Sequence, residues 1–288
     1  MALPLVVGFD GSDSALRALD WAVDEAVRRR LPLRIVYASL WERYEPAVPI
    51  FGSERPDDDV MTERIIASAQ ERVQKLAPDA EVQSVLTPED PVAALVRESH
   101  EAAAVVTGSR GRGAVTGLLL GSVSLSVAGR AHCPVVVVRG EDSEVHGRIV
   151  VGVGDPDEAA SAVRFALREA EARGCEVRAV RAWRCAEQYP ANGTAAAGDT
   201  AFAHEQRALA FLARALDVPE SEHPEVTVHR EAVEGPAHKV LLARSAGADL
   251  LVLGAARRAG GLGLQLGRVS HTALHHAACP VAVVPYTV

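Results

Sequence analysis

Lysine is nearly absent from this chain, although it has 30 basic residues in total. Only Lys75 and Lys239 occur, and neither follows a glycine or precedes a serine or threonine. A P-loop places its lysine in that context, so the sequence excludes this kind of phosphate-binding loop. The net charge of -8 argues against a general nucleic-acid-binding surface, because non-specific affinity for a phosphate backbone comes mainly from clustered lysine and arginine.

Long apolar runs are also missing. The sequence contains no stretch of about eighteen consecutive apolar residues, which is the length that a membrane-spanning helix needs. Its first residues, Met-Ala-Leu-Pro-Leu-Val-Val-Gly, lack the positively charged segment that opens a secretory signal. We therefore expect a soluble, cytoplasmic protein with no membrane partner.

Cysteine is scarce, and no two cysteines are spaced as a C-x2-C pair. The four cysteines are Cys133, Cys175, Cys185 and Cys279. Cys133 and Cys279 each precede a proline and a valine-rich run, which places them at the start of equivalent strands. We expect buried structural thiols, which fit a reducing compartment.

Apolar runs of strand length alternate with segments of helical periodicity in the first half of the chain. This alternation predicts a parallel β-sheet that is covered by helices on both faces. The predicted strands are 3–9, 31–39, 80–86, 103–107 and 134–139, and the predicted helices are 14–30, 57–76, 91–101 and 125–130.

The second half of the chain repeats the first. Gly254, Gly267 and Cys279 each follow Gly108, Gly121 and Cys133 by 146 positions, and the segment 149–153 repeats 5–9 at a spacing of 144. Such a period across the whole chain indicates a duplicated domain. We expect one domain over residues 1–140 and a second over 147–288, joined by the polar segment 140–147.

A glycine-rich stretch follows the fourth predicted strand. Gly108 is followed after two residues by Gly111, and after nine more by Gly121 and Ser122. A strand that ends in glycines and continues as a helix leaves unpaired N–H groups at the helix start, where the helix dipole favours an anion such as phosphate. We expect Gly108 and Gly111 to allow positive φ and a close approach of the backbone to a triphosphate.

Polar side chains around the same stretch suit a phosphate. Ser122 and Ser124 can cap free N–H groups or bond to phosphate oxygens. Arg110 and Arg112 add positive charge and donors that match these oxygens.

The pattern G-x2-G-x9-G-[S/T] resembles the nucleotide-binding signature of the universal stress protein family, and both halves of the chain share this resemblance. It implies two tandem Rossmann-like α/β domains, each a five-stranded parallel sheet with helices on both faces. Members of the family commonly pair through their fifth strands, which here implies 134–138 against 280–284. A homodimer of the whole chain is a further expectation.

The resemblance also implies a ligand, ATP with or without Mg²⁺. The aspartate that matches Asp10 contacts the nucleoside in the family, and the backbone that matches Ala38 reads the adenine edge. An aspartate in this turn is equally an ordinary helix cap. The candidate nucleotide-binding residues of the first half are Gly8, Phe9, Asp10, Ala38, Thr107, Gly108, Arg110, Gly111, Arg112, Gly113, Gly121, Ser122, Val123 and Ser124.

The second half departs from the pattern at its ligand positions. Gly154, Arg257 and Arg268 stand where the first half has Asp10, Gly111 and Ser122. A long side chain where the backbone should approach phosphate argues against ordinary ATP binding there. Gly254, Gly267 and Ser270 are retained as a candidate second site.

Catalytic residues cannot be identified in the sequence. It offers no Ser-His-Asp order, no paired catalytic carboxylates and no activated cysteine. His271 and His275 lie four residues apart on a predicted helix, as two metal ligands can, but no third ligand lies at a recognisable spacing. The sequence therefore predicts no catalytic residue and no metal site.

The resulting interpretation is an ATP-binding regulatory protein of the stress-response type, which acts through nucleotide-dependent conformation or through an unknown protein partner. One alternative is a slow ATPase or a nucleotide-dependent transfer enzyme with weak ATP hydrolysis. Another is an NADP-dependent oxidoreductase, because Gly111–Gly117 resembles a degraded dinucleotide fingerprint. That fingerprint should follow the first strand, whereas here it follows the fourth.

Overall fold

The computed structural model describes residues 2–38, 58–111, 120–140, 144–154, 156–184, 197–257 and 264–287. The chain divides into two compact units, the first comprising Met1–Arg139 with Leu262–Leu264 and the second Gly140–Gly261 with Gln265–Val288. Each unit carries one copy of the alternating strand and helix pattern, and the two are described in turn.

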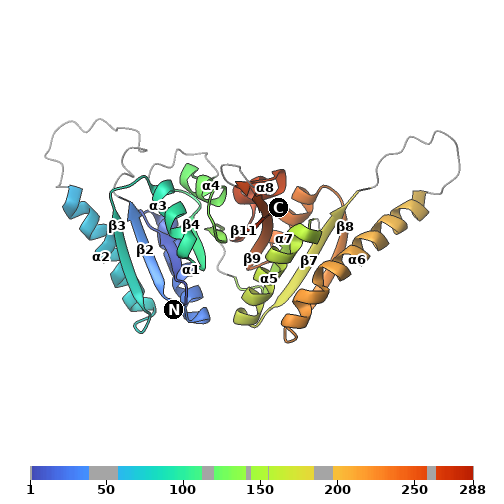
Figure 1. The fold of residues 1–288 in the computed structure, drawn as a ribbon, viewed down its shortest axis with the longest axis horizontal. Coiled ribbons are helices and arrows are strands. Elements are labelled where there is room, and N and C mark those ends of the chain that lie inside the picture. The colour runs from blue at the N-terminus through green and yellow to red at the C-terminus, as the bar shows by residue number, and fades with distance from the viewer. Residues whose placement is uncertain are drawn as a thin grey trace. The chain divides into compact units, whose positions relative to one another are not determined.

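The first unit contains a parallel sheet in the order β3-β2-β1-β4-β5. Helices α1 and α2 pack on one face of this sheet, and α3 and α4 pack on the other (Figure 1). Its elements are β1 (Leu5–Gly8), α1 (Asp13–Arg29), β2 (Leu33–Ala38), α2 (Asp58–Leu76), β3 (Val82–Thr87), α3 (Pro91–Glu98), the 3-10 turn η2 (Ser99–Glu101), β4 (Ala104–Gly108), α4 (Ser122–Ala128) and β5 (Val135–Val138).

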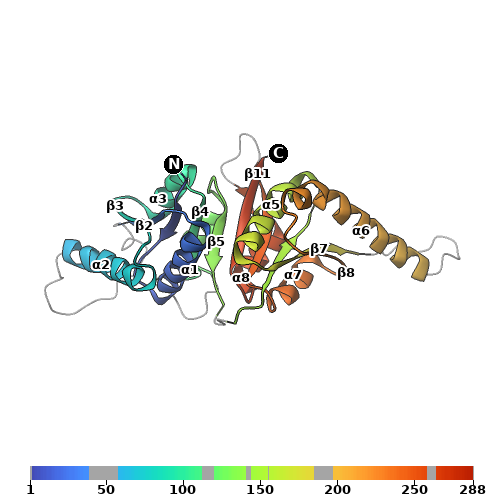
Figure 2. The ribbon, with the colours of Figure 1, turned by 90° about the horizontal axis from the view of Figure 1, so that it is seen from below.

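The second unit repeats this arrangement with the sheet order β8-β7-β6-β9-β11. Helices α5 and α6 cover one face of the sheet, and α7 and α8 cover the other (Figure 2). Its elements are β6 (Arg148–Gly152), α5 (Pro156–Arg173), β7 (Glu176–Trp183), α6 (Ala197–Glu222), β8 (Val228–Glu234), α7 (Ala237–Ser245), β9 (Leu250–Arg257), the short β10 (Leu264–Gln265) beside β9, α8 (Arg268–His276) and β11 (Val281–Thr287).

The predicted α/β class and the tandem five-stranded sheets are confirmed. The central strands are apolar on both faces, as in β5, where the side chains of Val135, Val136 and Val137 are fully buried. Such continuous apolar runs are expected when helices cover both sides of a parallel sheet. The pairing of the two halves through their fifth strands stays a prediction.

Helix α1 illustrates how local sequence sets an element. Ser12 caps its start by accepting a hydrogen bond from the Ala15 N–H at 3.2 Å. The helix ends at Arg30, whose φ of 53° is left-handed, a conformation that stops a helix. Its buried face is built mainly from small residues, including Ala18 and Ala22, so the helix axis can lie close to the sheet.

The cysteines at equivalent strand starts are buried, as expected. Cys133 and Cys279 are both in the core, and burial raises the pKa of the Cys133 thiol to about 12. Cys175 is partly exposed, and Cys185 lies outside the described residues. The raised pKa keeps Cys133 protonated and inert at neutral pH.

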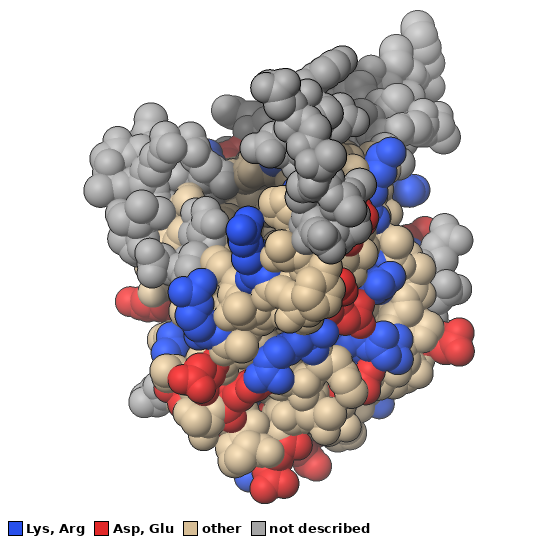
Figure 3. Space-filling model, turned by 90° about the vertical axis from the view of Figure 1, so that its right-hand side faces the viewer, with Lys and Arg blue, Asp and Glu red and all other residues tan. Residues whose placement is uncertain are grey.

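The face drawn in Figure 3 intersperses basic and acidic side chains rather than gathering one sign. In the second unit, Glu231 of the outer strand β8 accepts from Arg178 at 3.2 Å and from Arg244 at 2.8 Å. Charged side chains on an outer strand disfavour its pairing with another chain. Among the described residues, no helix is both long and apolar enough to span a bilayer.

Candidate functional site

The candidate site lies at the topological switch point of the first sheet, between β1 and β4. Strands β1 and β4 are adjacent and parallel, with Leu5 beside Ala104 and Val7 beside Val106. The chain runs outward from β1 to β3 on one side and from β4 to β5 on the other. In open α/β sheets, the carboxyl ends of the strands at such a switch point form the usual ligand crevice.

Asp10 follows β1 at this point and is only 4% exposed. One of its carboxylate oxygens, Oδ1, accepts a hydrogen bond from the Ser12 N–H at 2.9 Å. A Cβ added at Gly111 would lie 3.1 Å from the other oxygen, Oδ2. The loop after β4 therefore runs against the Asp10 carboxylate, and the two features that the sequence singled out separately are brought together.

Ser14 and Ser109 also belong to this site, and sequence reasoning missed both. Ser14, in the first turn of α1, accepts a hydrogen bond from the Arg110 N–H at 3.1 Å. Its hydroxyl lies 3.5 Å from that of Ser109. Ser14 precedes Ser109 by about a hundred positions, so no local spacing in the sequence could have linked them. The only signal in the sequence was a small polar residue in the first turn of a helix that is largely buried.

Gly108 and Gly111 are required by close contacts rather than by positive φ. The expectation of positive φ is wrong, because neither residue is among the glycines with positive φ, such as Gly11 with 82°. A Cβ at Gly108 would lie 2.6 Å from the backbone carbonyl of Ser14. Gly108 thus permits α1 to pack against the end of β4.

Helix α4 begins at Ser122, three residues before the predicted start. Gly121 is its N-cap residue and provides no side-chain capping bond; its own N–H donates to the Ser109 carbonyl at 2.8 Å. Ser124 is buried, and its hydroxyl donates to the Gly108 carbonyl at 2.6 Å. The exposed Ser122 thus opens the helix beside the glycine loop, while Ser124 ties the helix to β4.

The remaining predicted residues have different settings. Phe9 is fully buried in the core, and its N–H donates to the Val36 carbonyl at 3.0 Å. Ala38 ends β2 and is buried, and Thr107 carries a buried hydroxyl with no hydrogen-bond partner among the described residues.

Gly8 serves packing, since a Cβ there would lie 2.9 Å from a methyl group of Leu95. Val123 is half-buried and Arg110 is exposed. Arg112 and Gly113 lie outside the described residues.

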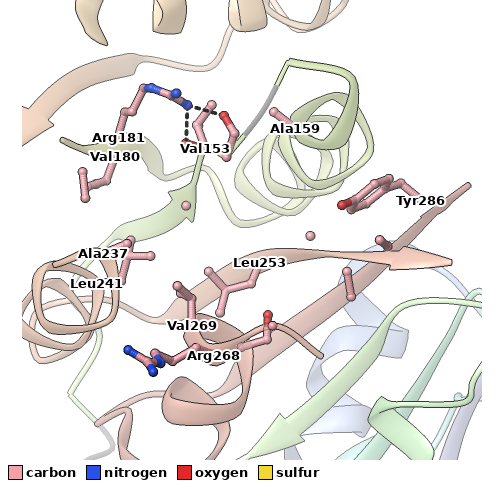
Figure 4. Close-up of a pocket in the computed structure, with 18 residues that line it drawn as sticks. Val153, Ala159, Val180, Arg181, Ala237, Leu241, Leu253, Arg268, Val269 and Tyr286 are labelled. Atoms are coloured by element: carbon pink, nitrogen blue, oxygen red, sulfur yellow. Dashed lines mark hydrogen bonds between the residues drawn. The ribbon is translucent and has the colours of Figure 1, made fainter. Parts of the chain in front are cut away.

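The second half has a cavity of about 590 Å³ at the matching position (Figure 4). All three retained motif residues, Gly254, Gly267 and Ser270, line it. Gly154 also lines it and, like Asp10, lies two residues beyond a glycine that ends a strand. The second half therefore has a cavity at the position that matches the candidate site of the first half, but glycine replaces the aspartate there.

Two arginines line this second cavity. Arg181 of β7 donates from Nη1 to the Val153 carbonyl at 3.3 Å and to the Gly154 carbonyl. Its guanidinium carbon lies 3.5 Å from the ring centroid of Phe211, within the range of a cation–π contact. Figure 4 shows Arg268, at the start of α8, at a separate end of the lining.

The histidines on α8 pack together. The rings of His271 and His275 have their centroids 4.6 Å apart. Within the part of the chain that the structure describes, no group of three or more histidine, cysteine, aspartate or glutamate side chains is arranged to hold a metal ion.

Comparison with known proteins identifies the family. The chain matches the universal stress protein family twice, over residues 1–139 and 146–285. It belongs to the universal stress protein family. Universal stress protein Rv2005c of Mycobacterium tuberculosis is 37% identical to it, over 97% of this chain and 96% of that protein. A tandem organisation over nearly the full length is therefore shared with this relative.

A solved structure agrees with the fold. A universal stress protein from Archaeoglobus fulgidus superposes with a TM-score of 0.70 at 20% identity, and the match covers 98% of each chain. A universal stress protein solved in complex with cAMP is 31% identical over 48% of this chain and 98% of its own, with a TM-score of 0.37.

In this universal stress protein, the glycine loop follows β4, the fourth strand of its unit. A dinucleotide fingerprint should follow the first strand, where its glycines contact the pyrophosphate. The position of the loop therefore argues against the oxidoreductase alternative.

Proposed function

We propose that the first half of this protein binds an adenine nucleotide, ATP with Mg²⁺, and that nucleotide occupancy governs its conformation or its binding to a protein partner. The observation that carries the proposal is the convergence of Asp10, Gly111 and the start of α4 at the switch point of the sheet. A buried carboxylate and an open helix start are suited to opposite ends of a nucleotide.

The two ends differ in what they recognise. The carboxylate of Asp10 accepts hydrogen bonds and suits the hydroxyl or amino groups of a nucleoside. The start of α4 presents backbone N–H groups without a side-chain cap, and such N–H groups favour phosphate. Mg²⁺ would accompany ATP, because this ion bridges phosphate oxygens, keeps several waters and needs few protein ligands.

The hydrogen bonds of the serine hydroxyls around the loop favour nucleotide binding over nucleotide hydrolysis. The hydroxyl of Ser124 is bonded to the Gly108 carbonyl, and Ser14 accepts from the Arg110 N–H. These groups hold the loop in place rather than position a water molecule. A receptor that retains its nucleotide needs this rigidity, because preorganised contacts lower the cost of binding.

The substitution Gly111→Arg tests the proposal. Its side chain would start 3.1 Å from the Asp10 carboxylate, so the guanidinium would pair with that group and occupy the space of the phosphates. We expect ATP affinity to fall by at least about a hundredfold, the loss of two or more charge-assisted contacts. Isothermal titration calorimetry measures the affinity.

Circular dichroism checks that the variant is folded, and Gly111→Ala is the matched control, since a methyl group reaches only the edge of this space. Unchanged ATP affinity in folded Gly111→Arg would refute the assignment of the phosphate loop.

A further inference from the structure

We propose that the outer edge of β3 pairs with β3 of a second copy of this chain, so that the first sheets of two molecules continue into one another. The inference goes beyond the function proposed for the first half and does not depend on nucleotide binding. β3 comes last in the order of the first sheet, beside β2 alone (Figure 1). Three features support the pairing: the outward backbone groups of β3, its lack of charge and the match of its side chains across a twofold axis.

The backbone groups on the outer edge of β3 follow from its register with β2. Leu33 lies beside Val82, and the Leu33 N–H donates to the Glu81 carbonyl at 2.8 Å. In a parallel pair, such a bond fixes which alternate residues of the strand turn their N–H and C=O groups toward the neighbour. The groups of Val82, Ser84 and Leu86 therefore point away from β2, and no other described strand pairs with them.

β3 lacks the charged side chains that protect the equivalent strand of the second half. From Val82 to Thr87 its sequence is V-Q-S-V-L-T, without a charged residue. β8 carries Arg230, Glu231 and Glu234, and the first two of these are held in ion pairs. Charges on an outer strand disfavour pairing with another chain, and their absence leaves β3 available for it.

The residues of β3 match one another when a twofold axis passes through Ser84. In this antiparallel register, Ser84 faces Ser84 of the second copy, and Val82 faces Leu86 of the second copy. These residues all have outward backbone groups, so each facing pair exchanges both of its N–H···O bonds. The axis makes the two copies equivalent, as an isologous dimer requires.

The same register covers apolar side chains that are exposed in the single chain. Gln70 of α2 donates to the Ser84 hydroxyl at 3.0 Å, so the Ser84 side chain lies on the face that α2 covers. Val82 and Leu86, two residues away on either side, share this face. The Leu86 side chain is 52% exposed. Opposite Val82 of the second copy, its Cβ would lie within about 5.5 Å of an apolar partner, which removes apolar surface from water.

The side of α2 that contacts β3 is also uncharged. Residues three and four positions from Gln70 lie on its side of the helix, and these are Ile66, Ala67, Val73 and Gln74. A twofold axis brings like residues together, so a charge on this side would be repeated in both copies. A neutral strand beside a neutral helix side therefore favours a second copy over a partner that is recognised by charge.

The substitution Ser84→Arg tests the interface, because Arg230 stands at the equivalent place in β8. Two guanidinium groups would meet at the axis, and like charges disfavour association. We expect the parent chain to be a dimer at micromolar concentration in sedimentation equilibrium. Ser84→Arg should raise the dissociation constant of this dimer by at least about a hundredfold. Val218→Arg is the matched control, since Val218 is 55% exposed on α6 of the second half and the added charge is the same. Circular dichroism checks that both variants are folded.

The substitution Ser84→Cys gives a positive signal for the register. The axis would place the two introduced cysteines with their Cα atoms about 5.5 Å apart, a separation that a disulfide spans. Mild oxidation should therefore link the two copies. Arg230→Cys, at the equivalent place in the charged strand, should not form this link, and the parent chain controls for the native cysteines.

Three outcomes would overturn the inference. These are a parent chain that is monomeric throughout the micromolar range, a folded Ser84→Arg variant that dimerises as the parent does, and disulfide-linked dimers that form as readily in Arg230→Cys as in Ser84→Cys. A monomeric parent would leave the edge to a strand of a different protein. ATP is omitted from these experiments and its binding is titrated separately, so a failure of the proposed nucleotide function would be recognised as a distinct result.

Discussion

At the residue scale, Asp10 is the side chain that we propose for recognition of the nucleoside end of a ligand in the first half. Asp10 is buried, and its carboxylate touches both the Ser12 N–H and the space beside Gly111. A carboxylate in that position has two roles available, as an Asx-type cap of the turn into α1 and as an acceptor for a ligand. The roles can be separated, because only the second requires the negative charge to face a ligand.

We predict that Asp10→Ala lowers the affinities for adenosine and ATP by similar factors of about ten- to a hundredfold, the value of one charge-assisted hydrogen bond. Competition by inorganic triphosphate should be unchanged, because we propose that the phosphates contact the start of α4 and not Asp10. Asp10→Asn is the matched control, since its amide oxygen can still accept from the Ser12 N–H. If Asp10→Ala binds ATP as the parent does, the residue is a cap and nothing more.

Gly108 gives a second prediction at this scale. A Cβ at residue 108 would lie 2.6 Å from the carbonyl carbon and oxygen of Ser14, and backbone cannot move aside as a flexible side chain does. Gly108→Ala should therefore destabilise the fold by about 1–3 kcal/mol, the usual cost of overpacking, as measured by urea denaturation.

Gly121→Ala serves as the control for this experiment. Its Cβ would lie 3.6 Å from the Arg110 Cα, an ordinary contact distance, so we expect a loss of less than about 1 kcal/mol, which comes from placing alanine at the N-cap of α4. Equal losses of stability in both variants would contradict the packing explanation for Gly108.

At the element scale, the two short helices that follow the glycine loops are attached differently. In the first half, the Ser124 hydroxyl joins α4 to the end of β4 through a 2.6 Å bond with the Gly108 carbonyl. In the second half, Ser270 occupies the same place on α8 without such a bond among the described residues. The equivalent serines therefore differ. The Ser124 hydroxyl holds α4 against the end of β4, whereas Ser270 lines the cavity without such a bond.

This difference predicts unequal responses to the same change. Ser124→Ala should lower the free energy of unfolding by about 1 kcal/mol, because a buried hydrogen bond is lost and the Gly108 carbonyl is left without that donor. Ser270→Ala should be close to neutral in the absence of ligand. Thermal or urea denaturation of the two variants side by side measures the contrast, and a reversed order would contradict it.

Most elements of the fold could be predicted from the sequence because each carries its own local pattern. The valine runs of β1, β4 and β5 and the buried stripe of small residues on α1 are visible in the chain itself. The start of α4 was placed too late, since Ser-Val-Ser is a weak helix-forming run and the helix begins there through its contacts with the glycine loop.

The site was predictable only in part. The glycine spacing and Asp10 could be identified as separate features, but their contact depends on two strands that lie far apart in the sequence and adjacent in the sheet. The same holds for Ser14 and Ser109, whose pairing exists only after α1 packs on β4. The close contact that requires glycine at position 108 also forms only when α1 packs on β4. From the sequence alone, this glycine was therefore attributed to a need for positive φ.

At the scale of the whole molecule, duplication has preserved packing and altered recognition. Gly8 and Gly152 both leave room for a leucine of the helix above, Leu95 in one case and Leu241 in the other. The ligand positions, by contrast, have exchanged a carboxylate for a glycine and a serine for an arginine. We infer that packing has constrained the two halves in the same way, while the residues at their ligand positions have diverged.

The dependence of the first half on the second can be tested on residues 1–139. In the order of its sheet β5 comes last, beside β4 alone within its unit, and its four residues are all valine. The outer edge of such a strand presents unpaired backbone N–H and C=O groups beside apolar side chains, a combination that promotes pairing with another chain. We therefore predict that the fragment dimerises through β5 or precipitates. Light scattering after size-exclusion chromatography, with the full chain at equal concentration as the control, decides between these states, and a fragment that stays monomeric and folded over a range of concentrations would contradict the prediction.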